Sequence, residues 1–289
     1  MTIAELHGKL SPYERMEDLL TSDVFSTFKY LEPDNGLVPF LKKAISFIDK
    51  THPKFLLDIK EANYVFWPKT THLNREPDVL IVLTKKDKST ISILIEAKYT
   101  SGKSNLIREK EEGVGKLNLD HLDGDQLAEL YKELQEGNIH IENQKTRDKF
   151  IKSEGNRYLF YVTSHYDLPK QDIDETLKIL KKKSYGNQKY KEFYWVNWMC
   201  ILDSIDEVNG KETWAYAPPN RLLLSDLKDL LLKKELVPFY GFSNLQVNFT
   251  TPDVFFWREE FQNRENLLFW SIDIKRIKRD IQNYFWMGE

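Results

Sequence analysis

The sequence has almost no cysteine and no long apolar run. Its 289 residues include one cysteine, Cys200, which excludes an internal disulfide framework and is typical of a reducing compartment. The opening stretch MTIAELHGKL contains no basic segment followed by apolar residues, and no later segment approaches the roughly 20 apolar residues that cross a bilayer. These absences predict a cytoplasmic protein without a membrane partner.

Two common catalytic spacings are also missing. The six histidines form neither an HExxH pattern nor a Cys-His pattern, which argues against a zinc site. No GxxxxGK[ST] segment occurs, so the chain lacks the phosphate-binding loop of nucleotide-driven motors. What is present is the balance of an ordinary globular chain, with 41% hydrophobic and 30% charged residues.

Basic charge is not in excess either. The formal net charge is −3, which gives no sign of nucleic-acid binding, since phosphate recognition normally requires a basic surface. Acidic metal ligands subtract from the total, however, and a basic groove can exist on a protein whose overall charge is near neutral. Net charge therefore leaves a nucleic-acid partner open.

Apolar periodicity predicts a chain of mixed helices and strands. Runs such as DVLIVL at 78–83 are typical of strands buried on both faces. We expect helices over residues 11–31, 37–49, 171–183 and 222–236, a helix from 123 or 124 to 137, and strands over 55–67, 78–83, 90–99, 158–163 and 193–202. This order predicts an α/β domain with a mixed sheet over residues 1–166, followed by a carboxyl-terminal elaboration over 167–289 that packs on it or continues it.

The carboxyl-terminal elaboration is rich in aromatic residues and holds six of the seven tryptophans. Aromatic side chains can stack on nucleobases, but they more often pack in a core or an interface. We expect packing for this extension. A homodimer or a protein partner stays open, because no interface is visible in the sequence.

Three charged residues stand at the ends of two consecutive predicted strands. Asp78 follows Pro77 at the start of one strand, and Glu96 and Lys98 end the next strand after a gap of 17 residues. Because side chains alternate across a strand, Glu96 and Lys98 share a face, and a hairpin can place Asp78 beside them. The pattern therefore predicts two carboxylates and one ammonium at one edge of a sheet.

Such a trio suits phosphodiester hydrolysis. Paired carboxylates bind Mg²⁺ through oxygen, the metal acidifies a water, and a nearby lysine orients that nucleophile. The alternative is a solvated strand end at which Asp78 caps a turn. The Pro-Asp pair, the hairpin-sized gap and the strand-terminal Glu-x-Lys occur together, and this combination favours the metal site.

Pro77-Asp78 and Glu96-Ala97-Lys98 resemble the signature of the PD-(D/E)XK nuclease superfamily, over roughly residues 11–165. The resemblance implies a restriction-endonuclease-like core, in which helices flank a mixed central sheet. It also implies that Asp78, Glu96 and the Ala97 carbonyl ligate Mg²⁺, with Mn²⁺ as a substitute ion, and that Lys98 assists the attacking water. The implied substrate is DNA, and RNA stays open because such a site does not distinguish the sugars.

Further candidates surround this signature. Many superfamily members draw a carboxylate from the helix before the sheet, and Glu17 falls inside the apolar arc of that helix, whereas Asp18 lies on its polar face. A helix-terminal carboxylate favoured by the macrodipole is the alternative for Glu17. Gln126 is similar to the glutamine that several lineages place against the site, although QLAELY departs from the QxxxY arrangement. The alternative for Gln126 is an ordinary solvent-exposed helix residue. Arg75 and Lys103 flank the signature and are candidates for phosphate contacts, with ordinary surface charges as the alternative.

The sequence thus predicts a Mg²⁺-dependent deoxyribonuclease, most simply an endonuclease. The rival interpretation is a catalytically degenerate nuclease fold that binds nucleic acid or scaffolds a protein assembly. The complete set of Asp78, Glu96 and Lys98 favours the enzyme, because a scaffold has no need of all three.

Overall fold

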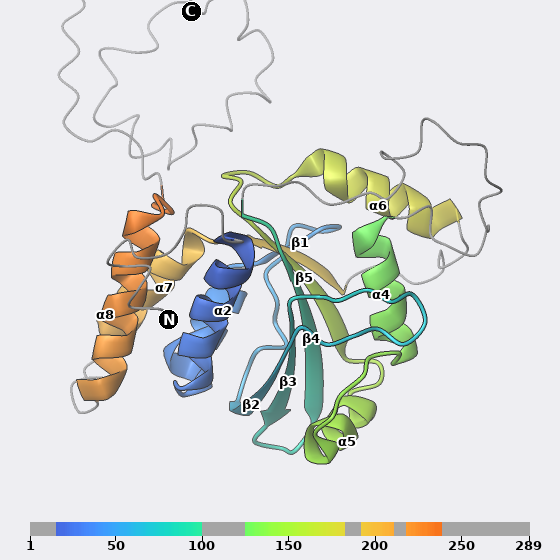
Figure 1. Ribbon diagram of the computed structural model, residues 1–289, viewed down its shortest axis with the longest axis horizontal. Coiled ribbons are helices and arrows are strands. Elements are labelled where there is room, and N and C mark those ends of the chain that lie inside the picture. Colours follow the sequence, from blue (N-terminus) through green and yellow to red (C-terminus); the bar gives the residue numbers. More distant parts are fainter. Residues whose placement is uncertain (1–15, 100–124, 183–191, 211–217, 239–289) are drawn as a thin grey trace, which may run out of the picture. The chain divides into compact units, whose positions relative to one another are not determined.

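The computed structural model describes residues 16–99, 125–182, 192–210 and 218–238. Within this part of the chain, six strands form one sheet in the order β1-β6-β5-β4-β3-β2 (Figure 1). The described residues up to Val237 belong to one compact unit. The expected start of the first helix at Ser11-Pro12 lies outside the described residues.

The sheet is mixed, and its topology gathers several strand ends at one edge. Strands β2 to β4 form an antiparallel meander, whereas β4, β5 and β6 run parallel to one another. Because β3 runs opposite to β4, the start of β3 lies at the same edge as the ends of β4, β5 and β6. The strands are β1 (Ile45–Ser46), β2 (Ile59–Phe66), β3 (Val79–Lys85), β4 (Thr90–Ala97), β5 (Arg157–Thr163) and β6 (Phe193–Asn197).

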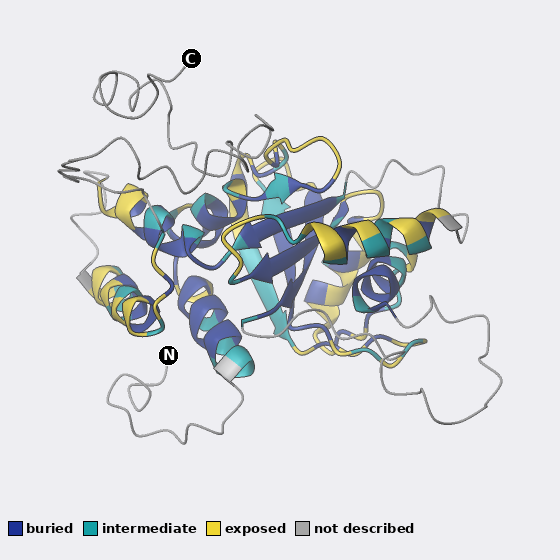
Figure 2. Ribbon diagram, turned by 90° about the horizontal axis from the view of Figure 1, so that it is seen from above, coloured by how far each residue is buried: buried dark blue, intermediate teal, exposed yellow. Residues whose placement is uncertain are grey.

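Helices cover both faces of the sheet. One apolar cluster joins the α2, α3, α7 and α8 helices to the sheet face that carries Ile81 and Ile93. A second cluster joins α4, α5 and α6 to the face that carries Leu80 and Leu94, so the central strands are buried between two layers (Figure 2). The helices are α2 (Met16–Lys29), η1 (Pro33–Asn35), α3 (Leu37–Lys42), α4 (Gln126–Glu136), α5 (Gln144–Lys152), α6 (Lys170–Lys182), α7 (Cys200–Asn209) and α8 (Pro218–Lys233).

This architecture confirms the predicted α/β class with a mixed sheet flanked by helices. The apolar run after Asp78 forms β3, in which residues 79–83 are fully buried, as its composition predicts for a central strand. No described helix combines the length and apolarity that a bilayer crossing demands.

Several predicted elements are shorter than their sequence patterns suggest, among them the strands expected over 55–67 and 90–99, which the structure limits to β2 and β4. The helix expected over 37–49 ends at Lys42, because the chain then forms β1, in which Ile45 pairs with Trp195 of β6. The strand expected over 193–202 ends at Asn197, and α7 begins at Cys200. The Asn197 side chain accepts a hydrogen bond from the Cys200 N–H at 3.0 Å, which turns the chain from strand to helix.

Helix α5 is absent from the sequence-based prediction, and the start of α4 is shifted. Only Thr146 and Phe150 of α5 are buried, so its apolar periodicity is too sparse to detect. Asn143 caps α5 by accepting a hydrogen bond from the Thr146 N–H. The cap of α4 is Asp125, in place of the expected residue 123 or 124, and both of those positions lie outside the described residues.

Residues on both sides of position 166 share one core. Strand β6 pairs with β5 in the sheet, and α7 and α8 contribute to the first apolar cluster. Trp195 and Trp198 are buried, in keeping with a packing role for these aromatic side chains. The remaining tryptophans of the carboxyl-terminal elaboration, at positions 214, 257, 270 and 286, lie outside the described residues.

A buried arginine ties α4 and α5 to the sheet. Arg157, the first residue of β5, is 5% exposed. Its guanidinium donates to the carbonyls of Leu134 (3.2 Å), Gln135 (2.8 Å) and Phe150 (3.4 Å) and lies 4.5 Å from the centroid of the Phe150 ring. One cation thus binds carbonyl groups near the carboxyl ends of two helices, where few intrahelical donors remain.

Arg157→Ala should lower the free energy of unfolding by about 3 kcal/mol, because hydrogen bonds from charged donors are strong and three of them are lost together with the contact to the Phe150 ring. Urea titration followed by circular dichroism measures the change. The matched control is Arg147→Ala, an exposed residue of α5, which should change stability by less than about 0.5 kcal/mol. Equal stability of the two variants would contradict this anchoring role.

Candidate active site

The three signature residues meet at the sheet edge where β3 begins and β4 ends. The hairpin register pairs Val79 with Ile95, which brings Asp78 next to the end of β4. Oδ2 of Asp78 accepts a hydrogen bond from the Ala97 N–H at 2.7 Å. Asp78, Glu96 and Lys98 are 7%, 2% and 8% exposed, so two carboxylates and an ammonium are nearly withdrawn from water.

The two oxygens of Glu96 have different surroundings. Oε1 lies 2.8 Å from Nζ of Lys98 and accepts a hydrogen bond from Nε2 of Gln126 at 2.6 Å. Oε2 is buried and has no hydrogen-bond partner within the part of the chain that the structure describes. A bare carboxylate oxygen in this position is costly, and a ligand that binds it would remove the cost.

Glu17 reaches the same edge of the sheet from α2, which covers the sheet face opposite to α4. The α2 helix packs on the sheet through Leu20 and Val24, and its first turn extends to the end of β4. Oε1 of Glu17 lies 3.1 Å from Nζ of Lys98, and Oε2 accepts a hydrogen bond from the Tyr99 N–H at 2.9 Å. The structure therefore brings Glu17 to Lys98. Of its two acidic neighbours, Asp18 is partly exposed and Glu14 lies outside the described residues.

Gln126 is placed by the cap of its helix. Asp125 accepts hydrogen bonds from the Ala128 N–H and from the Thr176 hydroxyl, both at 2.9 Å, which fixes the first turn of α4. The Gln126 amide then points at Glu96. Tyr131 of the QLAELY segment is buried elsewhere and donates to Glu192 at 3.4 Å.

Of the two expected phosphate contacts, the structure describes Arg75 alone. Its Nε donates to Oε2 of Glu129 at 2.5 Å, and Glu129 is buried on α4 one turn after Gln126. The Arg75 charge also lowers the pKa of Glu96, so the guanidinium lies within electrostatic reach of the site. Lys103 lies outside the described residues.

Burial and neighbouring charges shift the pKa values of the site residues. Burial, followed by the charge of Glu96, raises the pKa of Asp78 to about 8, although the Ala97 N–H and Lys98 oppose this rise. Burial also raises the pKa of Glu96 against the attraction of Lys98. For Lys98, burial alone would lower the pKa, but Glu96, Glu17 and Asp78 together raise it. The lysine therefore stays charged at neutral pH.

Sequence patterns did not reveal the residues that support the signature. Trp198 donates from Nε1 to the Lys98 carbonyl at 3.1 Å, and the Lys98 N–H donates to the Val162 carbonyl at 2.7 Å. Glu129, which holds Arg75, was likewise not identified. These partners lie between 54 and 100 residues away along the chain, so no local pattern could indicate them.

The comparisons with known proteins found no matching family model, no matching curated protein and no matching solved structure. A function for this chain is therefore inferred from the geometry of its own residues.

The raised pKa of Asp78 predicts a pH-dependent stability in the metal-free protein. A carboxyl group whose pKa rises from 3.8 when unfolded to about 8 when folded stabilises the fold most at low pH. That contribution is lost as pH rises through about 8. Urea titrations in the presence of a metal chelator should show that the free energy of unfolding of the parent is lower at about pH 8 than at about pH 6. This decrease should be smaller in Asp78→Asn than in the parent.

Asp87→Asn is the matched control. Asp87 is exposed in a turn, and hydrogen bonds from the Ser89 side chain and N–H lower its pKa, so it is ionised throughout this pH range. Its variant should keep the pH dependence of the parent. A parent protein whose stability does not fall over this interval would contradict the inferred protonation of Asp78.

Proposed function

We propose that this protein is a Mg²⁺-dependent nuclease that hydrolyses phosphodiester bonds in DNA as an endonuclease. The observation that carries the proposal is the buried, partnerless Oε2 of Glu96, which lies in a cluster with Asp78, Glu17 and the Lys98 ammonium. The helix-flanked mixed sheet is compatible with the restriction-endonuclease-like core that the signature resembles.

The residues fit a hard divalent cation. Asp78, Glu96 and the Ala97 carbonyl would supply the oxygen ligands that Mg²⁺ and Mn²⁺ prefer. Glu17, whose oxygens contact Lys98 and the Tyr99 N–H, would bind the ion directly or through one water. Three carboxylates face one ammonium, so the fully ionised site has an excess of negative charge. Gln126 donates to the Oε1 atom of Glu96 and thereby leaves its Oε2 atom for the ion.

The chemistry divides between the ion and the protein. A bound Mg²⁺ supplies acidification of a water and offsets the charge that develops on the phosphate oxygens. Lys98 holds the water: its Nζ is fixed by Glu96 and Glu17, and its raised pKa keeps it a hydrogen-bond donor. The lysine therefore orients the nucleophile and does not act as the general base. Arg75, which forms an ion pair with Glu129, supplies positive charge for a substrate phosphate.

The stability of the fold argues for an enzyme and against a scaffold. Replacing a buried ion pair by apolar residues of similar volume is often neutral or stabilising. Asp78 and Glu96 both have raised pKa values, so the fold gains nothing from their negative charge. A protein that served only as a scaffold would have no physical reason to bury this set.

The test is incubation with plasmid DNA, single-stranded DNA and RNA, with Mg²⁺, with Mn²⁺ and with EDTA. We expect cleavage of DNA that requires the metal. Lys98→Ala should lower the rate at least about 100-fold while leaving metal and DNA binding. Asp78→Asn should lose both metal binding and cleavage. Rates come from gel assays, and metal binding from calorimetry.

Each other outcome has a defined meaning. Undiminished turnover in Lys98→Ala would contradict the role of the lysine. DNA binding without cleavage, in either metal, would favour a catalytically degenerate nuclease fold. Cleavage of RNA but not of DNA would support the proposed phosphodiester hydrolysis and show that the substrate is RNA.

Glu17→Gln should cut the cleavage rate by about 10- to 100-fold with little change in folding stability, because the amide keeps acceptor oxygen for Tyr99 but removes a negative charge from the site. Mg²⁺ titrations of the rate and thermal denaturation separate the two effects. Asp18→Asn, the next residue of α2, should behave like the parent. Full activity in Glu17→Gln would remove that residue from the site.

A further inference from the structure

A second group of metal-ligating side chains lies at the other end of α4. The ligand atoms of His72, Glu133 and Glu136 all lie within 4.8 Å of one another. His72 belongs to the segment between β2 and β3, and the two glutamates occupy the last turn of α4. Glu133 follows Gln126 by seven residues, which separates the two clusters by about 10 Å along the helix.

Glu133 has an oxygen that the protein does not satisfy. Its side chain is fully buried, and Oε2 accepts hydrogen bonds from the N–H groups of His72 (3.1 Å) and Leu73 (3.4 Å). Oε1 is also buried, and no group in the described residues donates to it. An orphaned carboxylate oxygen in a protein interior calls for a bound water or ion.

The other two ligands already converge on one donor. Nδ2 of Asn138 lies 2.9 Å from Nδ1 of His72 and 2.9 Å from Oε2 of Glu136. Because an amide nitrogen only donates, Nδ1 of His72 accepts and carries a lone pair that faces this point. The amide thus holds an imidazole nitrogen and a carboxylate oxygen in the arrangement that a cation needs. If the Asn138 amide were flipped by about 180°, its oxygen would take the place of its nitrogen and act as a fourth ligand.

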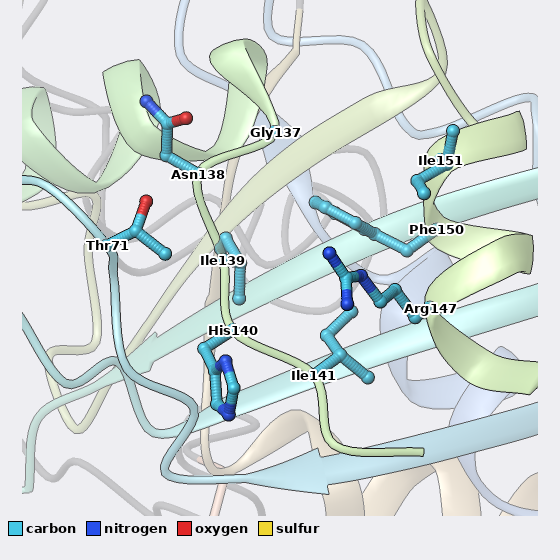
Figure 3. Close-up of a pocket in the computed structure, with 9 residues that line it drawn as sticks. All are labelled: Thr71, Gly137, Asn138, Ile139, His140, Ile141, Arg147, Phe150 and Ile151. Atoms are coloured by element: carbon cyan, nitrogen blue, oxygen red, sulfur yellow. The ribbon is translucent and has the colours of Figure 1, made fainter. Parts of the chain in front are cut away.

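The segments that supply these ligands are held together independently of any ion. The Thr71 N–H donates to the Asn138 carbonyl and the His140 N–H donates to the Lys69 carbonyl, both at 2.9 Å. Figure 3 shows Thr71 beside the segment that carries Asn138, with His140 farther along that segment. Ligands fixed in advance lose little conformational entropy when an ion binds.

We propose that His72, Glu133 and Glu136 bind a structural Zn²⁺ ion that joins the β2–β3 segment to α4. Carboxylates separated by one helical turn share a face of the helix, and an imidazole beside them suits Zn²⁺ better than Mg²⁺. The glutamates lie 61 and 64 positions after His72, which explains why no spacing motif indicated the site. The proposal does not depend on nuclease activity, because the segment is clamped whether or not the protein cleaves DNA.

The test measures Zn²⁺ binding and thermal stability of the full, metal-free chain, without any nucleic acid. Zn²⁺ at about 100 times its dissociation constant should raise the melting temperature of the parent by about 5–10 °C. His72→Ala should abolish that rise and remove one bound Zn²⁺ in calorimetry, and Glu136→Gln should weaken binding. Both residues are exposed, so these variants should fold.

Two controls isolate the site. His140→Ala replaces a nearby exposed histidine outside the cluster and should keep the full rise. Asp78→Asn should also keep it, which separates this ion from any metal bound at the candidate active site. An equal rise in the parent and His72→Ala, or no binding of Zn²⁺ to the parent, would overturn the proposal and leave a water at Glu133.

Discussion

The interaction on which the candidate site depends is the Lys98 ammonium held between Glu96 and Glu17, at 2.8 and 3.1 Å. It joins the end of β4 to the first turn of α2, two elements that otherwise belong to different layers. Without it, buried carboxylates would face each other with no compensating charge, at a cost of several kcal/mol. Val162 of β5 and Trp198, which lies between β6 and α7, fix the backbone that presents this ammonium.

The burial that strengthens the ion pair also makes the protonation of Asp78 and Glu96 depend on whether a cation is bound. Desolvation favours protons on Asp78 and Glu96 when no cation is present, whereas a divalent cation bound as proposed would reverse that preference and hold the carboxylates ionised. Lys98 remains charged in the metal-free protein, because its acidic neighbours outweigh its own desolvation. Under the proposed function, proton release and metal uptake would therefore be coupled, and the lysine is not the group that titrates near neutral pH.

What the sequence could predict follows from the range of the contacts. Asp78, Glu96 and Lys98 converge through one hairpin, and the alternation of side chains along a strand is a local rule. The apolar arc of a single helix likewise pointed to Glu17. By contrast, the pairing of β1 with β6, and the hydrogen bond from Trp198 to Lys98, join residues that only the folded sheet brings together. Helix α5 was not predicted, because it buries too little apolar surface to leave a periodic pattern in the sequence.

Helix α4 contributes Gln126 to the candidate active site and also positions residues from other elements. Gln126, Glu129 and Glu133 are spaced three and four residues apart, so they share one face of the helix. Gln126 donates to Glu96, Glu129 accepts from Arg75, and Glu133 accepts two backbone N–H groups of the β2–β3 segment. Glu129 and Glu133 are buried, and their partners outside the helix offset part of the cost of burying charge, although Oε1 of Glu133 has no partner in the described residues. The segment that leads to Asp78 is thus held along the whole length of α4. Thr70 of the same loop fixes the backbone of Arg75, and Glu129 of the helix fixes its guanidinium.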